Sequence, residues 1–258
     1  MPDAVPLSTL PVAQVRTAIA GAAARTGVPF DFLLRQAKVE SSLDPGAKAK
    51  TSSAGGLFQF TRGTWRNTLA KHGSEHGLDW AASALARGAT GSELQQIDAL
   101  RFDPATASLM AGELASDNRA TLEGALGRPV DDVDLYLAHF LGAGGATKFL
   151  QSLAADPTQP GASLFPDAAA ANSSVFYGSG GPRSLSEIRE LLATKLGQPI
   201  TAPAAPSFAR ATPVTQSFAA QPDEPQRSLA LGTIEPMPGR LSLELAARAY
   251  SRIAGVGA

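Results

Sequence analysis

The sequence predicts a mainly α-helical domain. In several segments apolar residues recur at intervals of three or four positions, which is the period of a helix with one buried face. Capping side chains precede these segments and glycines follow them, as expected at helix ends. No segment shows the strict apolar–polar alternation of a half-buried strand. With 258 residues, 44% of them hydrophobic, the chain can form one sizeable domain plus an appendage, or two small domains.

The N-terminal residues predict two helices. The first covers about residues 10–25 and ends at Gly27, and the second follows Pro29. Each has an apolar face at helical spacing: Val12, Val15, Ile19 and Ala22 in the first, and Phe30, Leu33, Leu34 and Ala37 in the second. Residues 44–60 are rich in glycine, serine and alanine and predict an ordered loop. Residues 64–71 predict another short helix, whereas residues 72–91 show too weak a pattern for a prediction.

Further helices are expected downstream. Asp103 and Pro104 form a helix start, because aspartate caps the first turn and proline suits its first position. Residues 131–141 are apolar on more than one side, which predicts a central helix. Residues 184–196 predict another, with a capping box at its start and a glycine at its end: Ser184, Glu187 and Gly197.

The composition changes near Gln198. Eight prolines lie between Pro199 and Pro238 amid alanine, serine, threonine and glutamine, which predicts a disordered linker over residues 198–240. Apolar residues at helical spacing in residues 241–258 predict a short amphipathic helix. Such a helix cannot bury its apolar face alone, so we expect it to dock on the domain formed by residues 1–197 or to bind a protein partner.

Charge and composition argue against several classes of function. The formal net charge of −1 leaves no basic excess to neutralise phosphates, so nucleic acid is not an expected partner. The absence of cysteine excludes disulfides and thiolate chemistry. No apolar segment reaches the length of a membrane span. The short alanine-rich stretch 18–24 lies between Arg16 and Arg25 and does not resemble a Sec signal peptide.

One histidine pair has a spacing that can bind zinc on a helix. His72 and His76 are four residues apart, with Glu75 between them. Gly73 and Gly77 argue against a helix here, and the sequence offers no evident third ligand. We therefore expect a solvated loop at this position, no metal site and no cofactor.

Glu40 is the candidate catalytic residue. It follows Leu33 and Ala37 at helical spacing, so it lies on the apolar side of its helix and in the last turn. Partial burial and the negative end of the helix dipole both disfavour the charged carboxylate. A carboxylic acid that keeps its proton near neutral pH can donate it to a leaving group. Most glutamates in helices are solvated, so this position alone does not establish catalysis.

The segment LLRQAKVESSLDPGAKAKTSSAGGLFQFTRGTW, residues 33–65, resembles the catalytic core of the SLT family of lytic transglycosylases. That family has a Glu-Ser pair at a helix end, an Asn/Asp-Pro turn, a loop rich in Ser, Ala and Gly, a Gly-Leu-Met-Gln segment and a Gly-Thr pair. The counterparts here keep the order and spacing: Glu40-Ser41, Asp44-Pro45, Ser53-Ala54-Gly55, Gly56-Leu57-Phe58-Gln59 and Gly63-Thr64.

Two later segments extend the resemblance to about residues 12–150. RFDPATASLMAGELA, from Arg101, is similar to the family's Phe-Asp-Pro helix, and LAHFLGAGGA, from Leu137, is similar to its Ala-Tyr-Asn-Ala-Gly-Pro-Gly segment. In the second segment His139 replaces the family's tyrosine and Phe140 its asparagine. The family's tyrosine approaches the catalytic acid. A histidine can form a hydrogen bond at the same position, or it can serve the fold alone.

The resemblance implies a lysozyme-like domain that cleaves peptidoglycan between N-acetylmuramic acid and N-acetylglucosamine. Glu40 is expected to protonate the glycosidic oxygen and then to accept the proton of the C6 hydroxyl, which yields a 1,6-anhydro product. The expected substrate-binding residues are Ser41, Phe58, Gln59 and His139. The alternatives are a hydrogen bond from Ser41 to a helix-end carbonyl and simple core packing for Phe58.

Two rival functions remain open at this point. A hydrolytic muramidase uses water in place of the C6 hydroxyl, and a structural component of a wall-spanning assembly keeps the fold with little activity. The substrate makes the periplasm or the cell wall the expected site of action. A C-terminal helix that binds a partner suits an enzyme that opens the wall locally for a flagellum, a pilus, a secretion system or a phage.

Overall fold

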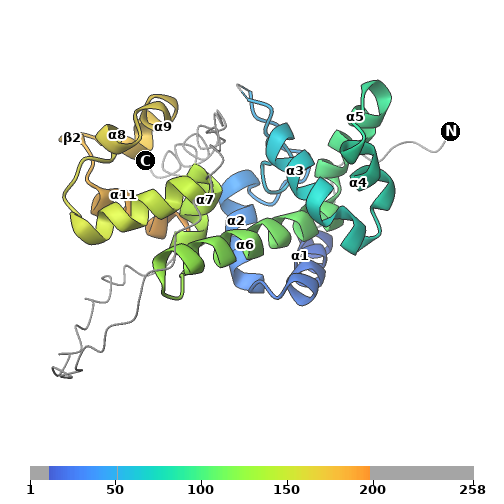
Figure 1. Cartoon of the computed structure of the whole chain (residues 1–258), viewed down its shortest axis with the longest axis horizontal. Helices are drawn as coiled ribbons and strands as arrows, with labels where there is room; N and C mark the ends of the chain where they lie inside the picture. The colour runs from blue at the N-terminus through green and yellow to red at the C-terminus, as the bar shows by residue number, and fades with distance from the viewer. Residues whose placement is uncertain (1–11, 51, 198–258) are drawn as a thin grey trace, which may run out of the picture. The chain divides into compact units, whose positions relative to one another are not determined.

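The computed structural model describes residues 12–50 and 52–197, and all of them belong to one of the two compact units into which the chain divides. This part of the chain is mainly helical, which confirms the predicted fold class (Figure 1). The predicted linker, residues 198–240, and the predicted C-terminal helix, residues 241–258, lie outside the described residues. Within the described ranges, no helix combines the length and the apolar character needed to cross a membrane.

The first two helices are those that the sequence predicts. Helix α1 spans Val12–Thr26 and buries Val15, Ile19 and Ala22. Helix α2 spans Phe30–Ser41 and buries one side that includes Leu33, Ala37 and Glu40. The two residues directly after α2 both have left-handed backbone angles although neither is glycine: Ser42 has φ 55° and Leu43 has φ 66°. This tight end fixes the last turn of α2, where Glu40 lies.

Helix α3 is longer than the sequence predicts and leads into elements that the sequence does not reveal. It spans Arg62–His72, and the side chain of Thr61 caps it by accepting a hydrogen bond from the Thr64 N–H. The following elements are η2 (Gly73–His76), α4 (Asp79–Ala86), α5 (Gly91–Ala99) and η3 (Leu100–Phe102). Among these, α4 buries mostly alanines and α5 buries Ile97, so neither has the apolar stripe that reveals a helix in a sequence.

The expectation of a solvated loop at His72 and His76 is wrong. His72 is the last residue of α3, His76 ends η2, and their side chains are only 10% and 5% exposed. Gly73 adopts ordinary helical angles, and Gly77, with φ 76°, ends η2 as a left-handed cap. Both glycines are thus compatible with helical structure, and packing against other helices outweighs their weak intrinsic preference.

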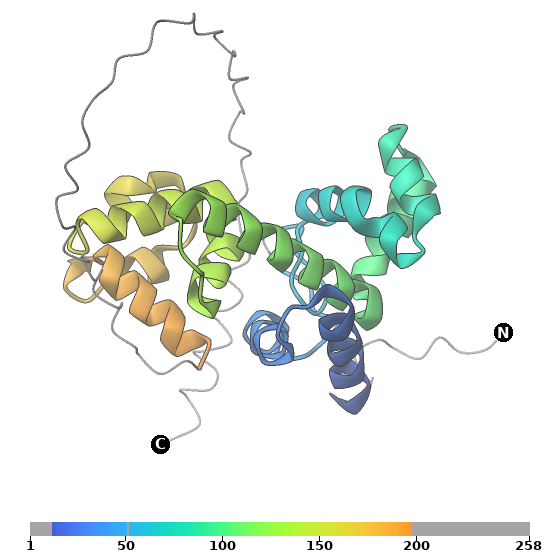
Figure 2. The ribbon, with the colours of Figure 1, turned by 60° about the horizontal axis from the view of Figure 1, so that its bottom comes forward.

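Helix α6 is the centre of this unit. It spans Pro104–Leu126 and starts as predicted, with the Asp103 carboxylate accepting a hydrogen bond from the Thr106 N–H at 2.8 Å. It packs against α1, α2, α3 and α7. In Figures 1 and 2, α6 runs between the N-terminal helices and the helices that follow it. Its contact with α1 is close, because a Cβ at Gly112 would lie 2.5 Å from Thr26 Oγ1.

Helix α7 confirms the predicted central helix and then continues past it. It spans Asp132–Ala155, buries residues on several sides, and is kinked at Gly142, which has φ 74° and ψ 160°. Before this kink, Tyr136 of α7 contacts Glu40 of α2, and α7 packs against α6. Gly142 therefore interrupts the helix, and a second helical stretch follows it.

The remaining described residues form short elements that cover α7. They are α8 (Gly161–Leu164), α9 (Pro166–Ala171), α10 (Ser173–Phe176), the two-residue strands β1 (Tyr177–Gly178) and β2 (Gly181–Pro182), and α11 (Leu185–Lys195). Helix α11 begins with the predicted capping box and packs against α7. Arg189 of α11 pairs with Asp131 and with Asp134, which is fully buried at the start of α7. These two ion pairs fix α11 on α7, the helix that faces Glu40.

Candidate active site

Glu40 lies in the last turn of α2 with its side chain 2% exposed. Its burial follows from the helical spacing that puts it on the same side as Leu33 and Ala37, both fully buried. The side chain is therefore sheltered, as the sequence predicts. A buried carboxyl group is costly unless polar groups or charges accompany it, so its neighbours decide what it can do.

Two side chains of α7 meet the Glu40 carboxyl group. The hydroxyl of Tyr136 donates a hydrogen bond to Glu40 Oε1 over 3.1 Å. His139 Nε2 lies 3.3 Å from the same oxygen, outside hydrogen-bond geometry. The two rings stack with their centroids 6.0 Å apart, as residues one turn apart on a helix can. His139 thus lies beside the acid without the hydrogen bond that was one of its two expected roles, and Tyr136 supplies a hydroxyl that makes such a bond.

Tyr136 is a permanent donor at this position. Its side chain is fully buried, and burial together with the nearby Glu40 charge raises the pKa of Tyr136 well above its usual value. The phenol therefore stays protonated throughout the physiological pH range. It can stabilise the Glu40 carboxylate after the carboxyl group has released its proton.

Ser41, the last residue of α2, and Gln59, in the loop before α3, both form hydrogen bonds with backbone near the site. Ser41 Oγ lies 2.8 Å from the Leu57 carbonyl oxygen and 3.0 Å from that of Ala37, so its hydroxyl bonds to backbone at the helix end. Gln59 is 1% exposed and donates from Nε2 to the Gly56 carbonyl oxygen over 2.8 Å. Ser41 thus joins the loop to α2, and its bond to the Ala37 carbonyl is the second of the two roles considered for it, whereas Gln59 bonds within the loop.

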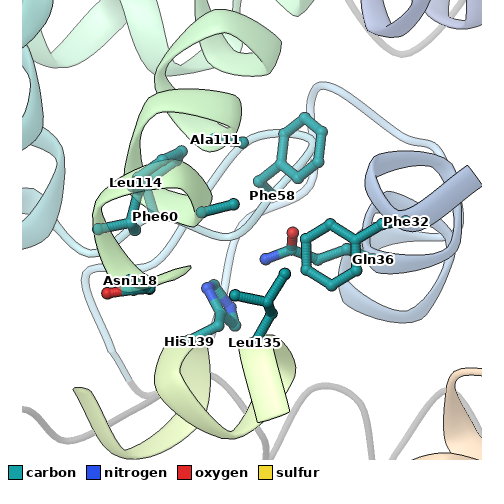
Figure 3. Close-up of a pocket in the computed structure, with 10 residues that line it drawn as sticks. Phe32, Gln36, Phe58, Phe60, Ala111, Leu114, Asn118, Leu135 and His139 are labelled. Carbon is teal, nitrogen blue, oxygen red and sulfur yellow. The ribbon is translucent and has the colours of Figure 1, made fainter. Parts of the chain in front are cut away.

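A cavity opens beside this group. About 260 Å³ there is free of protein atoms, but this volume includes open solvent, and the space that a water-sized molecule can occupy is only about 10 Å³. Two predicted substrate-binding residues line it, Phe58 and His139, together with Gln36 and Asn118. In Figure 3 the Gln36 amide from α2 points into the space between Phe58 and His139. Phe58 is also 1% exposed, so it serves the core and the cavity wall at once.

Several buried polar atoms around this cavity have no hydrogen-bond partner among the described residues. They are Gln36 Oε1, Glu40 Oε2, Gln59 Oε1 and His139 Nε2. Almost all buried polar atoms in folded proteins are paired, so a group of unpaired ones on adjoining elements needs a cause. Binding of a polar ligand, with hydroxyl and amide groups, is one such cause.

Lys195, the last residue of α11, adds a positive charge near this group. Burial lowers the pKa of Lys195, and although the Glu40 charge acts in the opposite direction, the net pKa is below the usual value. Lys195 is 155 positions from Glu40 in the sequence and belongs to no motif, so the sequence alone does not connect the two residues.

The structure brings together part of the predicted site. His139 contacts Glu40 and lines the cavity with Phe58, whereas Glu40, Ser41 and Gln59 lie behind the cavity wall. Tyr136 and Gln36 were missed. Each had a signal in the sequence: Tyr136 stands one turn before His139, and Gln36 stands one turn before Glu40 on the buried side of α2.

Replacing Tyr136 with phenylalanine tests the contact with Glu40. Tyr136→Phe removes the donor and leaves a buried carboxyl oxygen without it, so we expect the free energy of unfolding to fall by about 1–3 kcal/mol. Urea denaturation of the full chain measures this change. Tyr177→Phe is the matched control, because the Tyr177 side chain is 45% exposed. Equal losses in the two variants would contradict a specific bond between Tyr136 and Glu40.

No model of a known protein family matches this chain.

Proposed function

We propose that this protein is a lytic transglycosylase that cleaves peptidoglycan glycan strands, with Glu40 as its acid and base. The observation that carries the proposal is a single buried carboxyl group at a helix end, held by Tyr136 and faced by His139. The sequence resemblance to the SLT family over residues 33–65 supports the choice of substrate and reaction. We propose accordingly that residues 1–197 form a lysozyme-like domain.

The proposed reaction needs only one carboxyl group. Glu40 donates its proton to the glycosidic oxygen as the bond between that oxygen and C1 of N-acetylmuramic acid breaks. The sugar's own acetamido group stabilises the positive charge at C1. Glu40, now a carboxylate, accepts the proton of the C6 hydroxyl while O6 bonds to C1, which closes the 1,6-anhydro ring. Atoms and charge balance without water.

The carboxyl groups of the chain agree with this scheme. Most glycosidases use two carboxyl groups, and substrate-assisted enzymes are exceptions. The acidic residue nearest to Glu40 in the following turn is Asp44, and its carboxylate accepts a hydrogen bond from the Gly46 N–H over 2.8 Å. That bond is typical of a turn-forming aspartate. Among the described residues, the basic side chain within ion-pair distance of Glu40 is His139.

The Tyr136 and His139 side chains have distinct roles in this proposal. The Tyr136 hydroxyl stabilises the Glu40 carboxylate between the two proton transfers, because a hydrogen bond to the charged form lowers its energy. His139 lines the cavity and presents its unpaired Nε2 to the sugar and to Glu40. Gln36 and Gln59, whose amide oxygens are unpaired, are proposed acceptors for sugar hydroxyl or acetamido N–H groups.

One observation favours a structural role without catalysis. The Glu40 side chain is 2% exposed, and the cavity beside it leaves a water-sized molecule only about 10 Å³ in which to sit, far below the roughly 300–1,000 Å³ of typical ligand sites. A glycan strand therefore requires the walls of the cavity, Phe58 and His139 among them, to move apart before Glu40 can reach the glycosidic oxygen. A structural component of a wall-spanning assembly requires no such movement.

Incubation with purified, insoluble peptidoglycan separates the two functions. A transglycosylase binds the polymer and releases soluble fragments, which appear in the supernatant after centrifugation. A structural component sediments with the polymer and releases none. We expect steady release of soluble fragments by the full chain, and sedimentation without release would contradict the proposed activity. The proposal also includes a protein partner for residues 241–258 and a periplasmic or wall-facing site of action.

A further inference from the structure

A cluster of histidines and carboxylates lies outside the site around Glu40. It forms where the end of α3 and η2 pack against the middle of α6. His72, Glu75 and His76 come from the first side, and Glu113 and Asp117 come from α6. None of these residues lines the cavity beside Glu40. The proposed cleavage reaction does not use them.

Three ligand atoms in this cluster converge on one point. His72 Nδ1 lies 3.2 Å from Glu75 Oε1 and 3.4 Å from Glu113 Oε2, and each of the three side chains has one ligand atom within 4.8 Å of a ligand atom of the other two. A tetrahedral zinc ion with ligands at about 2.0–2.1 Å has ligand–ligand distances of about 3.3–3.4 Å. The two distances to His72 therefore already match those around a zinc ion. A nitrogen and two carboxylate oxygens are also a donor set that zinc accepts.

The other atoms of two of these side chains are held by outer partners. His72 Nε2 lies 2.9 Å from Asp117 Oδ2, so a carboxylate orients the imidazole through the nitrogen that faces away from the convergent point. Glu113 Oε1 lies 2.7 Å from His76 Nε2, which leaves Oε2 for the convergent point. Histidine ligands of metals are commonly held by a carboxylate in this way. The arrangement thus has an inner group, His72, Glu75 and Glu113, and an outer group, Asp117 and His76, that orients it.

The charge of the cluster calls for a cation. It contains three carboxylates, and in the described part of the chain Lys71 pairs with Asp117, whereas no lysine or arginine pairs with Glu75 or Glu113. Glu113 is 12% exposed, so solvent does little to screen it. A cation between these carboxylates is therefore favoured by the negative charge around it.

We propose that His72, Glu75 and Glu113 form a zinc site, with Asp117 and His76 as the outer groups that orient the ligands. Glu75 is 62% exposed, so one side of the site is open and water completes the coordination. The ion links the end of α3 and η2 to α6, which are separate in sequence. Of the histidine pair noted in the sequence, His72 is a proposed ligand and His76 an outer group, and α6 supplies the third ligand, which the sequence does not reveal.

Calorimetric titration of zinc chloride into the full chain, with any affinity tag removed, tests this site. Glu75→Gln is the decisive variant, because Glu75 is exposed and its replacement leaves the fold intact. We expect one zinc ion per wild-type chain and an affinity lower by about tenfold or more in Glu75→Gln. Glu113→Gln should show the same loss. In thermal unfolding, zinc should raise the melting temperature of the wild type more than that of Glu75→Gln.

Two control variants locate the ion. Glu190→Gln changes an exposed glutamate of α11 and should bind zinc like the wild type. Glu40→Gln should also bind like the wild type, because Glu40 and His139 form the other place where an imidazole meets a carboxyl group. The proposal is overturned if Glu75→Gln and the wild type bind zinc equally. It is also overturned if the wild type binds none at millimolar concentration, or if Glu40→Gln abolishes binding. The cluster would then be held together by a protonated His72.

Discussion

Glu40→Gln is expected to reduce the release of soluble peptidoglycan fragments by about 100-fold or more. A positioned acid or base contributes a factor of about 10²–10⁴, and glutamine can neither donate nor accept the proton. The amide keeps the size of the side chain and can still accept the hydrogen bond from Tyr136, so the fold should be preserved. The initial rate of release from purified peptidoglycan, at equal protein concentration, measures the effect.

Glu190→Gln is the matched control for this loss. It makes the same chemical change on the exposed surface of α11 and should keep the wild-type rate. Far-UV circular dichroism and the melting temperature of both variants show whether the chain is folded. If Glu40→Gln is folded and releases fragments as fast as the wild type, Glu40 is not the catalytic acid.

Gly56→Ala is expected to lower the free energy of unfolding by about 3 kcal/mol or more, the largest effect on stability that we predict. Gly56 has φ 78°, and a Cβ there would lie 2.0 Å from the backbone carbonyl oxygen of Arg101. The clash is with backbone, which cannot move aside as a flexible side chain does. Arg101 also donates to the carbonyl oxygens of Ser53 and Phe60, so the strain spreads through the loop beside Glu40.

Gly63→Ala is the matched control for Gly56→Ala. Gly63 lies in the first turn of α3, and a Cβ there meets no atom within 4 Å. Alanine favours a helix over glycine by about 1 kcal/mol, so this variant should be as stable as the wild type or slightly more stable. Denaturant unfolding of both variants gives the comparison. Equal stability of Gly56→Ala and the wild type would contradict the close approach of this loop to Arg101.

The features that could be predicted from the sequence are those set by local pattern. The spacing of Leu33, Ala37 and Glu40 predicts that the acid is buried, and the structure confirms it. The caps at Asp103 and Ser184 are likewise correct, because a capping side chain bonds to backbone only three residues away. Local bonds of this kind depend on a few neighbouring residues, so they can be predicted without the rest of the fold.

The features that were missed depend on distant residues. Tyr136 and Glu40 are 96 positions apart, and only the packing of α7 beside α2 makes them partners. Helix α5 is held by the bond from Trp65 Nε1 to the Ile97 carbonyl oxygen over 2.8 Å and by the double hydrogen bond between Arg66 and Asp98. Neither contact leaves a periodic apolar pattern. The proposed zinc site could not be predicted for the same reason, because its third ligand, Glu113, lies on another helix.

The central claim is that Glu40 cleaves glycan strands by passing a proton between substrate oxygens, with no water consumed. Digestion of purified peptidoglycan by the wild type in water labelled with the heavy oxygen isotope, followed by mass analysis of the fragments, tests it most directly. The account predicts 1,6-anhydro ends without the label, and their absence when Glu40→Gln replaces the wild type. Fragments with labelled reducing ends and no anhydro ends would show that water is the acceptor and would contradict the account.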